Sequence, residues 1–254
     1  MGKYRKLKQR RTWAWWLVVP VVKPLLLATT KPEWIDGDKI PETGGCILVL
    51  NHVTQLDPLT AAHLVWDYGR LPHYLAKAGL FKNKALGTFL RSAGQIPVER
   101  ASTNAVGAFQ AAVDEVRNGQ LVVVYPEGSV TKDPDLWPMV GKSGAARIAL
   151  ETGCPVIPVG QWGAHELLPA YGKPNLKGGR KPVKMKVGDP VDLSDLLGKD
   201  ITSETVREAS SRIMAAIVHL VEEVRGGTAP VDRFDPVKAG IAATGNPNAK
   251  PKKK

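Results

Sequence analysis

Apolar and polar stretches alternate regularly through the middle of the chain, from about residue 33 to residue 191. Short apolar runs such as GCILVLN (45–51) and LVVVY (121–125) are typical of buried strands. Longer segments with helical spacing lie between them, among them PLTAAHLVWDYG (58–69), which ends at a glycine. This alternation predicts a layered α/β domain with loops at the strand ends available for a site. Further strands are expected at 73–76, 95–99, 155–162 and 182–191, and further helices at 85–94, 102–119 and 143–153.

A last amphipathic helix is expected from Ser203 to Arg225. After Gly226 no apolar period survives, and proline, glycine, asparagine and lysine dominate. The sequence therefore predicts three parts: a segment of residues 1–30, a folded domain of residues 31–225, and a flexible basic tail of residues 226–254. The apolar stripe of the last helix is formed by Val206, Ala209, Ile213, Ile217, Leu220 and Val224.

The first 30 residues combine a basic arm with a broken apolar run. The run extends from Trp13 to Ala28, 16 residues that include Pro20, Lys23 and Pro24. A bilayer span needs about 20 apolar residues, and tryptophan prefers the headgroup boundary. We therefore expect an interfacial segment that lies in one leaflet. A cleaved export signal is the alternative, but Lys23, the prolines and the lack of an A-x-A site disfavour it.

The net charge of +11 is concentrated at the two ends of the chain. Ten of the 35 basic residues lie in the first eleven and last five positions, and without them 25 basic residues face 24 acidic ones. This distribution does not favour a nucleic-acid stripe, whereas basic ends suit an anionic membrane surface. Cys46 and Cys154 each lie beside an apolar run, which predicts two free thiols in a reducing compartment and no metal site.

The stretch NHVTQLD places His52 directly after a predicted strand and five positions before Asp57. Asp57 followed by Pro58 is also an ordinary helix start, with a carboxylate that caps the helix. Three further turns carry polar residues or prolines at predicted strand ends. They are GQIPVER (94–100), VYPEGSV (124–130) and CPVIPVG (154–160).

In order and spacing these four stretches resemble the 1-acylglycerol-3-phosphate acyltransferase family, membrane-associated enzymes with an N-H-x-x-x-x-D motif. Residues 94–100 match its second block, roughly G-x-x-F-I-D-R, and residues 125–130 match its third, F-P-E-G-T-R. Residues 155–159 match the fourth block, and the resemblance covers about residues 30–195. It implies a glycerolipid acyltransferase-like α/β domain behind a membrane-interfacial segment.

The resemblance implies that His52 is the general base and that Asp57 orients it. Histidine exchanges protons near neutral pH, and a carboxylate on its other ring nitrogen fixes the tautomer. The expected reaction moves a fatty acyl group from acyl-CoA or acyl-carrier protein to 1-acylglycerol 3-phosphate and gives phosphatidic acid. No metal, prosthetic group or nucleic acid is expected, and the expected location is the cytoplasmic face of the cell membrane.

Further residues of the blocks are expected to bind substrate. Arg100 is expected to hold the acceptor phosphate through two parallel hydrogen bonds, with an ion pair to Glu99 as the alternative. Glu127 is expected to accept from a glycerol hydroxyl or to orient a cation, and Gly128 to let the backbone approach the ligand. Thr54 and Ser129 are alternative nucleophiles. The expected substrate-binding set is Asn51, Lys77, Arg100, Glu127, Gly128 and Ser129, where Lys77 adds positive potential or is simply a solvated lysine.

Two positions depart from the family pattern. Val130 stands where arginine is usual, so one phosphate contact is missing or comes from Lys132 or Lys142, and Pro97 replaces a bulky aromatic residue. The acceptor is therefore lysophosphatidate or a lysolipid with another headgroup. Rival functions are acyl transfer to glycerol 3-phosphate or another lysophospholipid, an esterase, and a non-catalytic membrane-binding protein.

Overall fold

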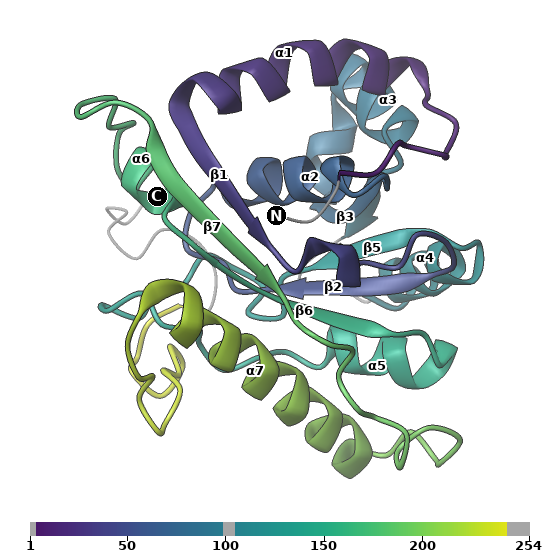
Figure 1. Cartoon of the computed structure of the whole chain (residues 1–254). Coiled ribbons are helices and arrows are strands. Elements are labelled where there is room, and N and C mark those ends of the chain that lie inside the picture. The colour runs from purple at the N-terminus through teal and green to yellow at the C-terminus, as the bar shows by residue number, and fades with distance from the viewer. Residues whose placement is uncertain (1–3, 99–104, 243–254) are drawn as a thin grey trace, which may run out of the picture.

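A single mixed sheet forms the centre of the molecule (Figure 1). The computed structural model describes residues 4–98 and 105–242. Within these residues the sheet has seven strands in the order β1-β7-β6-β2-β5-β3-β4. Strands β2 to β6 run parallel, and β1 and β7 run in the opposite direction. The strands are β1 (Thr30–Ile35), β2 (Cys46–Leu50), β3 (Pro72–Lys77), β4 (Ile96–Val98), β5 (Leu121–Val124), β6 (Val156–Trp162) and β7 (Lys181–Val187).

Helices cover both faces of the sheet, which confirms the predicted layered α/β class (Figure 1). One face carries α1 (Trp13–Thr29), α2 (Asp57–Asp67) and α3 (Lys84–Ser92). The other carries α4 (Ala105–Arg117), α5 (Gly144–Thr152) and α7 (Ser203–Arg225). The short elements are α6 (Ala164–Leu167) and two 3-10 turns, η1 (Gly37–Lys39) and η2 (Ala78–Lys82).

Strand β2 shows how the sequence builds these layers. All five of its residues are buried, and alternate side chains enter opposite cores. Ile47 and Val49 pack into the core below α4, α5 and α7, whereas Leu48 and Leu50 pack into the core beside α2. Because β2 to β6 are parallel, their last residues meet at one edge, here called the carboxyl edge. The loops that carry His52 and Glu127 follow β2 and β5 at this edge, whereas residues 155–159 of the fourth motif open β6 at the opposite edge.

Strand β1 was not expected, because its sequence TKPEWI has no strand-like alternation of apolar residues. It is an edge strand that pairs only with β7 among the described strands. Thr30 and Trp34 are its only buried residues, and Pro32 is tolerated because an edge strand leaves one side of its backbone unpaired.

Helix α1 contains the broken apolar run and is apolar around its whole circumference. Ala14, Trp15 and Leu26 face the domain and are buried. Lys23, which interrupts the run in sequence, also faces inward, and its Nζ lies 2.5 Å from Oδ1 of Asp67. No helix in the described residues is long and apolar enough to cross a bilayer. The outer face carries Trp13 (50% exposed), Trp16 (59%), Leu17 (60%), Val21 (67%) and Leu25 (60%).

The basic arm before α1 lies against the domain. The Arg5 guanidinium donates to the carbonyl oxygens of Ile40 and Asp38, and the ammonium of Lys8 lies 2.9 Å from Glu42. The Arg11 guanidinium lies 4.1 Å from the ring centre of Trp16. Three of the arm's cations therefore have partners within the protein.

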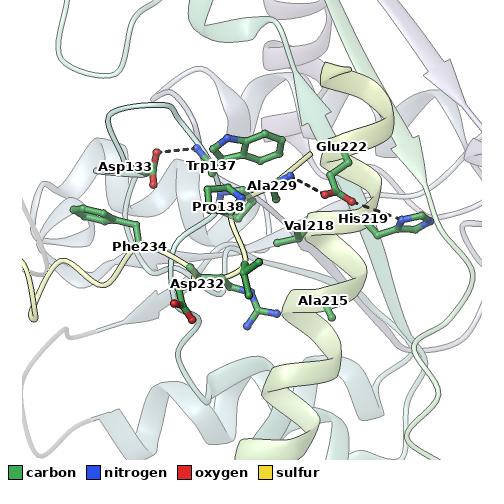
Figure 2. Close-up of a pocket in the computed structure, with 13 residues that line it drawn as sticks. Asp133, Trp137, Pro138, Ala215, Val218, His219, Glu222, Ala229, Asp232 and Phe234 are labelled. Carbon is green, nitrogen blue, oxygen red and sulfur yellow. Dashed lines mark hydrogen bonds and ion pairs between the residues drawn. The ribbon is translucent and has the colours of Figure 1, made fainter. Parts of the chain in front are cut away.

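Helix α7 has the predicted bounds, and its predicted apolar stripe is buried. The described residues after it also pack against the domain. The N–H of Val140 donates to the carbonyl of Phe234 at 3.0 Å, and the Lys132 ammonium donates to the carbonyl of Ala242. Figure 2 shows the cavity of about 180 Å³ that this segment encloses with α7, where the N–H of Ala229 donates to Glu222.

Candidate active site

His52 lies two residues after the end of β2, at the carboxyl edge. Its ring Nδ1 lies 2.8 Å from Oδ2 of Asp57, the first residue of α2. Because an ionised carboxylate only accepts hydrogen bonds, this contact places the proton on Nδ1 and leaves Nε2 as an acceptor. The ring of Tyr125 stacks on the imidazole with centroids 4.3 Å apart and planes 28° apart. The imidazole is therefore held in one tautomer and one orientation.

Asp57 is fully buried and binds the loop that carries His52. Its Oδ2 also accepts the N–H groups of Val53 at 2.7 Å and Thr54 at 2.9 Å. The prediction that Asp57 caps its helix is wrong. Leu56 occupies the cap position, and no side chain caps this helix, because the carboxylate turns back toward the preceding loop.

Glu127 joins the main chain of His52 to the loop after β5. The carboxylate is 2% exposed, its Oε1 accepts the N–H of His52 at 2.8 Å, and its Oε2 accepts the N–H of Met139 at 3.0 Å. Burial raises the pKa of Glu127 to about 8, although both hydrogen bonds act to lower it. These contacts are with backbone groups, whereas a glycerol hydroxyl or a cation was expected as the partner.

Asn51 occupies a different environment from the one expected for a substrate-binding residue. It is 1% exposed, and its amide pairs with the backbone of Gln161 at the end of β6. Asn51 Nδ2 donates to the Gln161 carbonyl at 3.0 Å, and its Oδ1 accepts the Gln161 N–H at 2.9 Å. The side chain therefore links the ends of two adjacent strands and fixes the position of the backbone at His52, the next residue.

The glycine after Glu127 is favoured by its left-handed backbone conformation. Gly128 has a φ of 72°, and a Cβ there would lie 2.6 Å from the Nζ of Lys142. Glycine thus leaves room for this ammonium group beside the turn. Ser129 follows in the same turn and is half-buried, whereas Val130 is 2% exposed and packs into the interior.

The two lysines considered for the missing arginine differ in their surroundings. Lys132 is 8% exposed and donates to the Ala242 carbonyl, and burial together with the charge of Lys142 lowers its pKa. Lys142 is exposed and lies over Gly128. Of the two, Lys142 is therefore the one placed beside the third block's turn with its side chain open to solvent.

Of the two remaining cations in the expected set, the structure describes only one. Lys77 is the last residue of β3. Strand β4 ends at Val98, and Glu99 and Arg100 lie outside the described residues. The Thr54 hydroxyl donates to the carbonyl of Leu168, so this alternative nucleophile is hydrogen-bonded within the fold.

A cavity of about 440 Å³ lies beside His52. The inner face of α1 forms one wall, α2 and α3 contribute others, and His52 and Tyr125 line it as well. The lining is mainly apolar, so the space suits an alkyl chain next to the imidazole. Its apolar residues include Trp15, Val18, Val19, Val22, Leu26, Leu59, Ala62, Trp66, Leu80, Phe89 and Leu90.

Sequence reasoning missed three parts of this site: the ring of Tyr125 on His52, the anchoring amide partner Gln161, and the α1 wall. Tyr125 had a signal, because an aromatic residue opens the third block. Gln161 is a polar residue at the end of an apolar run, which also marks a strand end. The cavity had no signal, since its walls come from segments far apart in the sequence. No group of three or more potential metal ligands occurs within residues 4–98 and 105–242.

The fold and site define an α/β protein with a buried-carboxylate–histidine pair beside an apolar cavity. The family model for acyltransferases matches residues 33–162, so the chain belongs to the acyltransferase family. This confirms the family resemblance that the four motifs indicated.

Curated relatives agree with this family. The 1-acyl-sn-glycerol-3-phosphate acyltransferase of Bacillus subtilis is 29% identical over 160 residues, 63% of this chain and 73% of that protein. That of Streptococcus pneumoniae is 29% identical over 194 residues, 75% of this chain and 66% of that protein. A chloroplast enzyme of the same name from Brassica napus is 31% identical over 125 residues, and the match spans only 35% of its length.

A solved structure supports the fold. The crystal structure of the 1-acyl-sn-glycerophosphate acyltransferase PlsC from Thermotoga maritima superposes with a TM-score of 0.61 at 24% identity. The match covers 84% of this chain and 80% of that one. The layered arrangement of sheet and helices is therefore shared with this enzyme.

Proposed function

We propose that this chain is an O-acyltransferase that acts at a membrane surface. It moves a fatty acyl group from acyl-CoA or acyl-carrier protein to the free hydroxyl of 1-acylglycerol 3-phosphate, which gives phosphatidic acid. The observation that carries the proposal is the His52–Asp57 pair at the wall of an apolar cavity. The names of the curated relatives support the same reaction.

In the proposed reaction, Nε2 of His52 accepts the proton of the acceptor hydroxyl while that oxygen attacks the thioester carbonyl carbon. The C–S bond then breaks, and His52 returns the proton to the departing thiolate. Asp57 holds the Nδ1–H and stabilises the imidazolium that forms between these two steps. The thioester is already activated, so the reaction involves no acyl-enzyme, metal or prosthetic group.

The acceptor phosphate binds Arg100 and Lys142 in this proposal. Arg100 belongs to the second block, and Lys142 lies over Gly128 of the third block. Because Val130 stands where the family has arginine, Lys142 takes over the phosphate contact of that arginine. Lys132 is the weaker candidate because its side chain is buried, whereas Lys142 is exposed. An acceptor with another headgroup is the alternative that Val130 leaves open.

The membrane is reached through α1 in this proposal. A soluble helix normally keeps a polar face toward water, but the outer face of α1 is apolar and exposed while its inner face lines the cavity. A helix with two apolar faces suits the boundary between the domain and a lipid leaflet. In this proposal the protein is a peripheral or monotopic protein at the cytoplasmic face of the cell membrane.

One assay tests the reaction and its acceptor. Purified protein is incubated with acyl-CoA or acyl-carrier protein and a panel of detergent-dispersed acceptors, and both thiol release and lipid products are measured. We expect thiol release only with acceptor, and phosphatidic acid as the main product with 1-acylglycerol 3-phosphate. Free fatty acid without acceptor would indicate an esterase, and vesicle binding without any thiol release would indicate a non-catalytic membrane protein. Preferred use of glycerol 3-phosphate would correct the acceptor.

A further inference from the structure

One loop concentrates positive charge outside the two chain ends. Between Glu166 and Asp189 the sequence holds six basic residues and no acid, although the body is otherwise nearly balanced. The basic loop, residues 169–181, carries four of the six and also exposes Leu176 to 68%. These four are Lys173, Lys177, Arg180 and Lys181. An apolar side chain among cations at a loop tip is unusual for a surface that meets only water.

The basic loop lies at the carboxyl edge, beside both α1 and the active-site turns. It connects α6 to β7, which begins where β6 ends because these two strands are antiparallel. In Figure 1 it projects next to the C-terminal end of α1. The Arg180 guanidinium donates to the carbonyl of Thr30 at 2.9 Å, directly after α1, and the Thr54 hydroxyl donates to the Leu168 carbonyl at the start of the loop.

Internal hydrogen bonds give the basic loop a defined shape. The N–H of Asn175 donates to the Leu167 carbonyl at 2.7 Å, and the Lys181 ammonium donates to the Lys177 carbonyl at 2.6 Å. The loop therefore presents Leu176 without first having to be ordered on binding, which would cost conformational entropy.

We propose that the basic loop is a second membrane-contact element, with Leu176 in the bilayer interface and Lys173 and Lys177 at anionic headgroups. The inference rests on the proposed action at a membrane surface. An anionic bilayer is favoured over an acidic carrier protein because the loop pairs its cations with an exposed leucine and lies beside the C-terminal end of α1, whose outer face is apolar and exposed. The basic arm supplies less of the attraction than its sequence suggests, since Arg5 and Lys8 have partners in the domain. Contacts at α1 and at the loop together turn the carboxyl edge toward the lipid.

Vesicle flotation with full-length protein tests the proposal. Lys173→Gln with Lys177→Gln is expected to lower partitioning onto vesicles containing phosphatidylglycerol by roughly 10- to 30-fold at low salt, at about 1 kcal/mol per cation, and much less at high salt. Leu176→Ser is expected to lower it about fivefold at either salt concentration. The matched controls are Lys199→Gln with Lys238→Gln, two exposed lysines elsewhere, and Leu197→Ser, which should bind like the wild type.

Activity on detergent-dispersed acceptor separates this inference from the proposed function. All loop variants should retain it within about twofold. Wild-type flotation by both loop variants would overturn the inference. If flotation were normal and only the KM for acyl-carrier protein rose, the loop would instead bind that acidic partner, and the inference would also be overturned. Lost detergent activity in the loop variants would assign the loop to the catalytic site and also overturn it. Absence of transfer by the wild type would instead overturn the proposed function and leave the flotation result intact.

Discussion

At the residue scale, His52 and Asp57 depend on each other through one short contact. His52→Ala removes the proposed base and should abolish acyl transfer with the fold intact, because the imidazole lines the cavity and is not part of a hydrophobic core. Asp57→Asn should lower kcat by about 10²–10⁴-fold, because the amide no longer fixes the imidazole tautomer. Steady-state rates with circular dichroism check both variants. Near-normal turnover by folded His52→Ala protein would exclude the mechanism.

Glu127 gives a pH-dependent prediction. Its pKa is about 8 in the folded protein against an ordinary 4.5, so between these values the folded state holds a proton that the unfolded chain releases. The free energy of unfolding should therefore fall as pH rises through this window, by up to about 1.4 kcal/mol per pH unit from this group. Glu127→Gln should remove that part of the slope.

Urea denaturation of both proteins between pH 5 and 8 measures the difference in slope. The variant should also start about 1–3 kcal/mol less stable at low pH, because one amide oxygen cannot accept from both His52 and Met139. Parallel stability curves for the two proteins would show that the Glu127 carboxyl does not change its protonation in this range.

The phosphate assignment predicts an unequal effect on the two substrates. Arg100→Ala should raise acceptor KM by about 10- to 150-fold, the loss of a charge-assisted contact of about 1.5–3 kcal/mol, and leave donor KM nearly unchanged. Lys142→Met should raise it less, about two- to fivefold, because the side chain is exposed. Lys132→Met is the control for lost charge. An equal rise in acceptor KM for Lys132→Met and Lys142→Met would contradict the choice of Lys142 over Lys132 as the phosphate ligand.

Sequence motifs located His52, Asp57 and Glu127 at strand ends, but not what Glu127 does there. The spacing of five residues between His52 and Asp57 is local, so one loop and one helix start suffice to predict their proximity. Both partners of Glu127 are backbone N–H groups, which no side-chain pattern indicates, and one of them, that of His52, lies 75 residues away. The same applies to Asn51, whose amide binds backbone groups of Gln161 110 residues further on.

At the element scale, apolar pattern predicted the elements that carry strong periodicity. Strand β2 is buried on both faces and helix α7 on one, and both lie close to the bounds that the sequence predicted. Strand β1 was missed because it buries only two side chains at the edge of the sheet. The apolar run of α1 indicated an interfacial segment, but an all-round apolar helix does not reveal which face packs on the protein.

The two faces of α1 predict separable effects. Replacing Trp16, Leu17, Val21 and Leu25 by serine should lower vesicle binding at any salt concentration, because apolar contact is not screened, and should spare activity in detergent. Replacing Val19 by tryptophan should instead lower activity with long acyl chains more than with short ones, because it fills the cavity. These substitutions are sharper than deletion of residues 1–30, which removes a cavity wall as well. Unchanged flotation of the outer-face variant would place the membrane contact elsewhere.

At the scale of the whole molecule, the parallel sheet brings the first and third motifs together. The first follows β2 and the third follows β5, and these adjacent parallel strands finish at one edge regardless of their separation in sequence, whereas residues 155–159 of the fourth motif open β6. That part of the site is predictable from strand order alone. The contributions of α1 and the C-terminal segment cannot be predicted from strand order. Both segments pack on the domain through contacts between residues far apart in the sequence, and neither has an apolar pattern that shows which residues make those contacts.

The C-terminal segment gives the last prediction. The sequence indicated a tail from residue 226, yet residues up to Ala242 contact the loop whose Met139 N–H binds Glu127. Truncation after Arg225 removes the Phe234 and Ala242 contacts and leaves the buried Lys132 without its carbonyl partner. We expect a loss of about 1–3 kcal/mol, a Tm lower by roughly 3–10 °C, and reduced kcat through a loosened Glu127.

Truncation after Ala242 is the matched control and should change neither Tm nor kcat, since the removed residues have no apolar period. Differential scanning calorimetry and steady-state rates distinguish the two proteins. If truncation after Arg225 were as stable and active as truncation after Ala242, the contacts of this segment would not support the loop. The position of His52 would then depend only on Asn51, Asp57 and Glu127 within the domain, and the folded unit would end with α7.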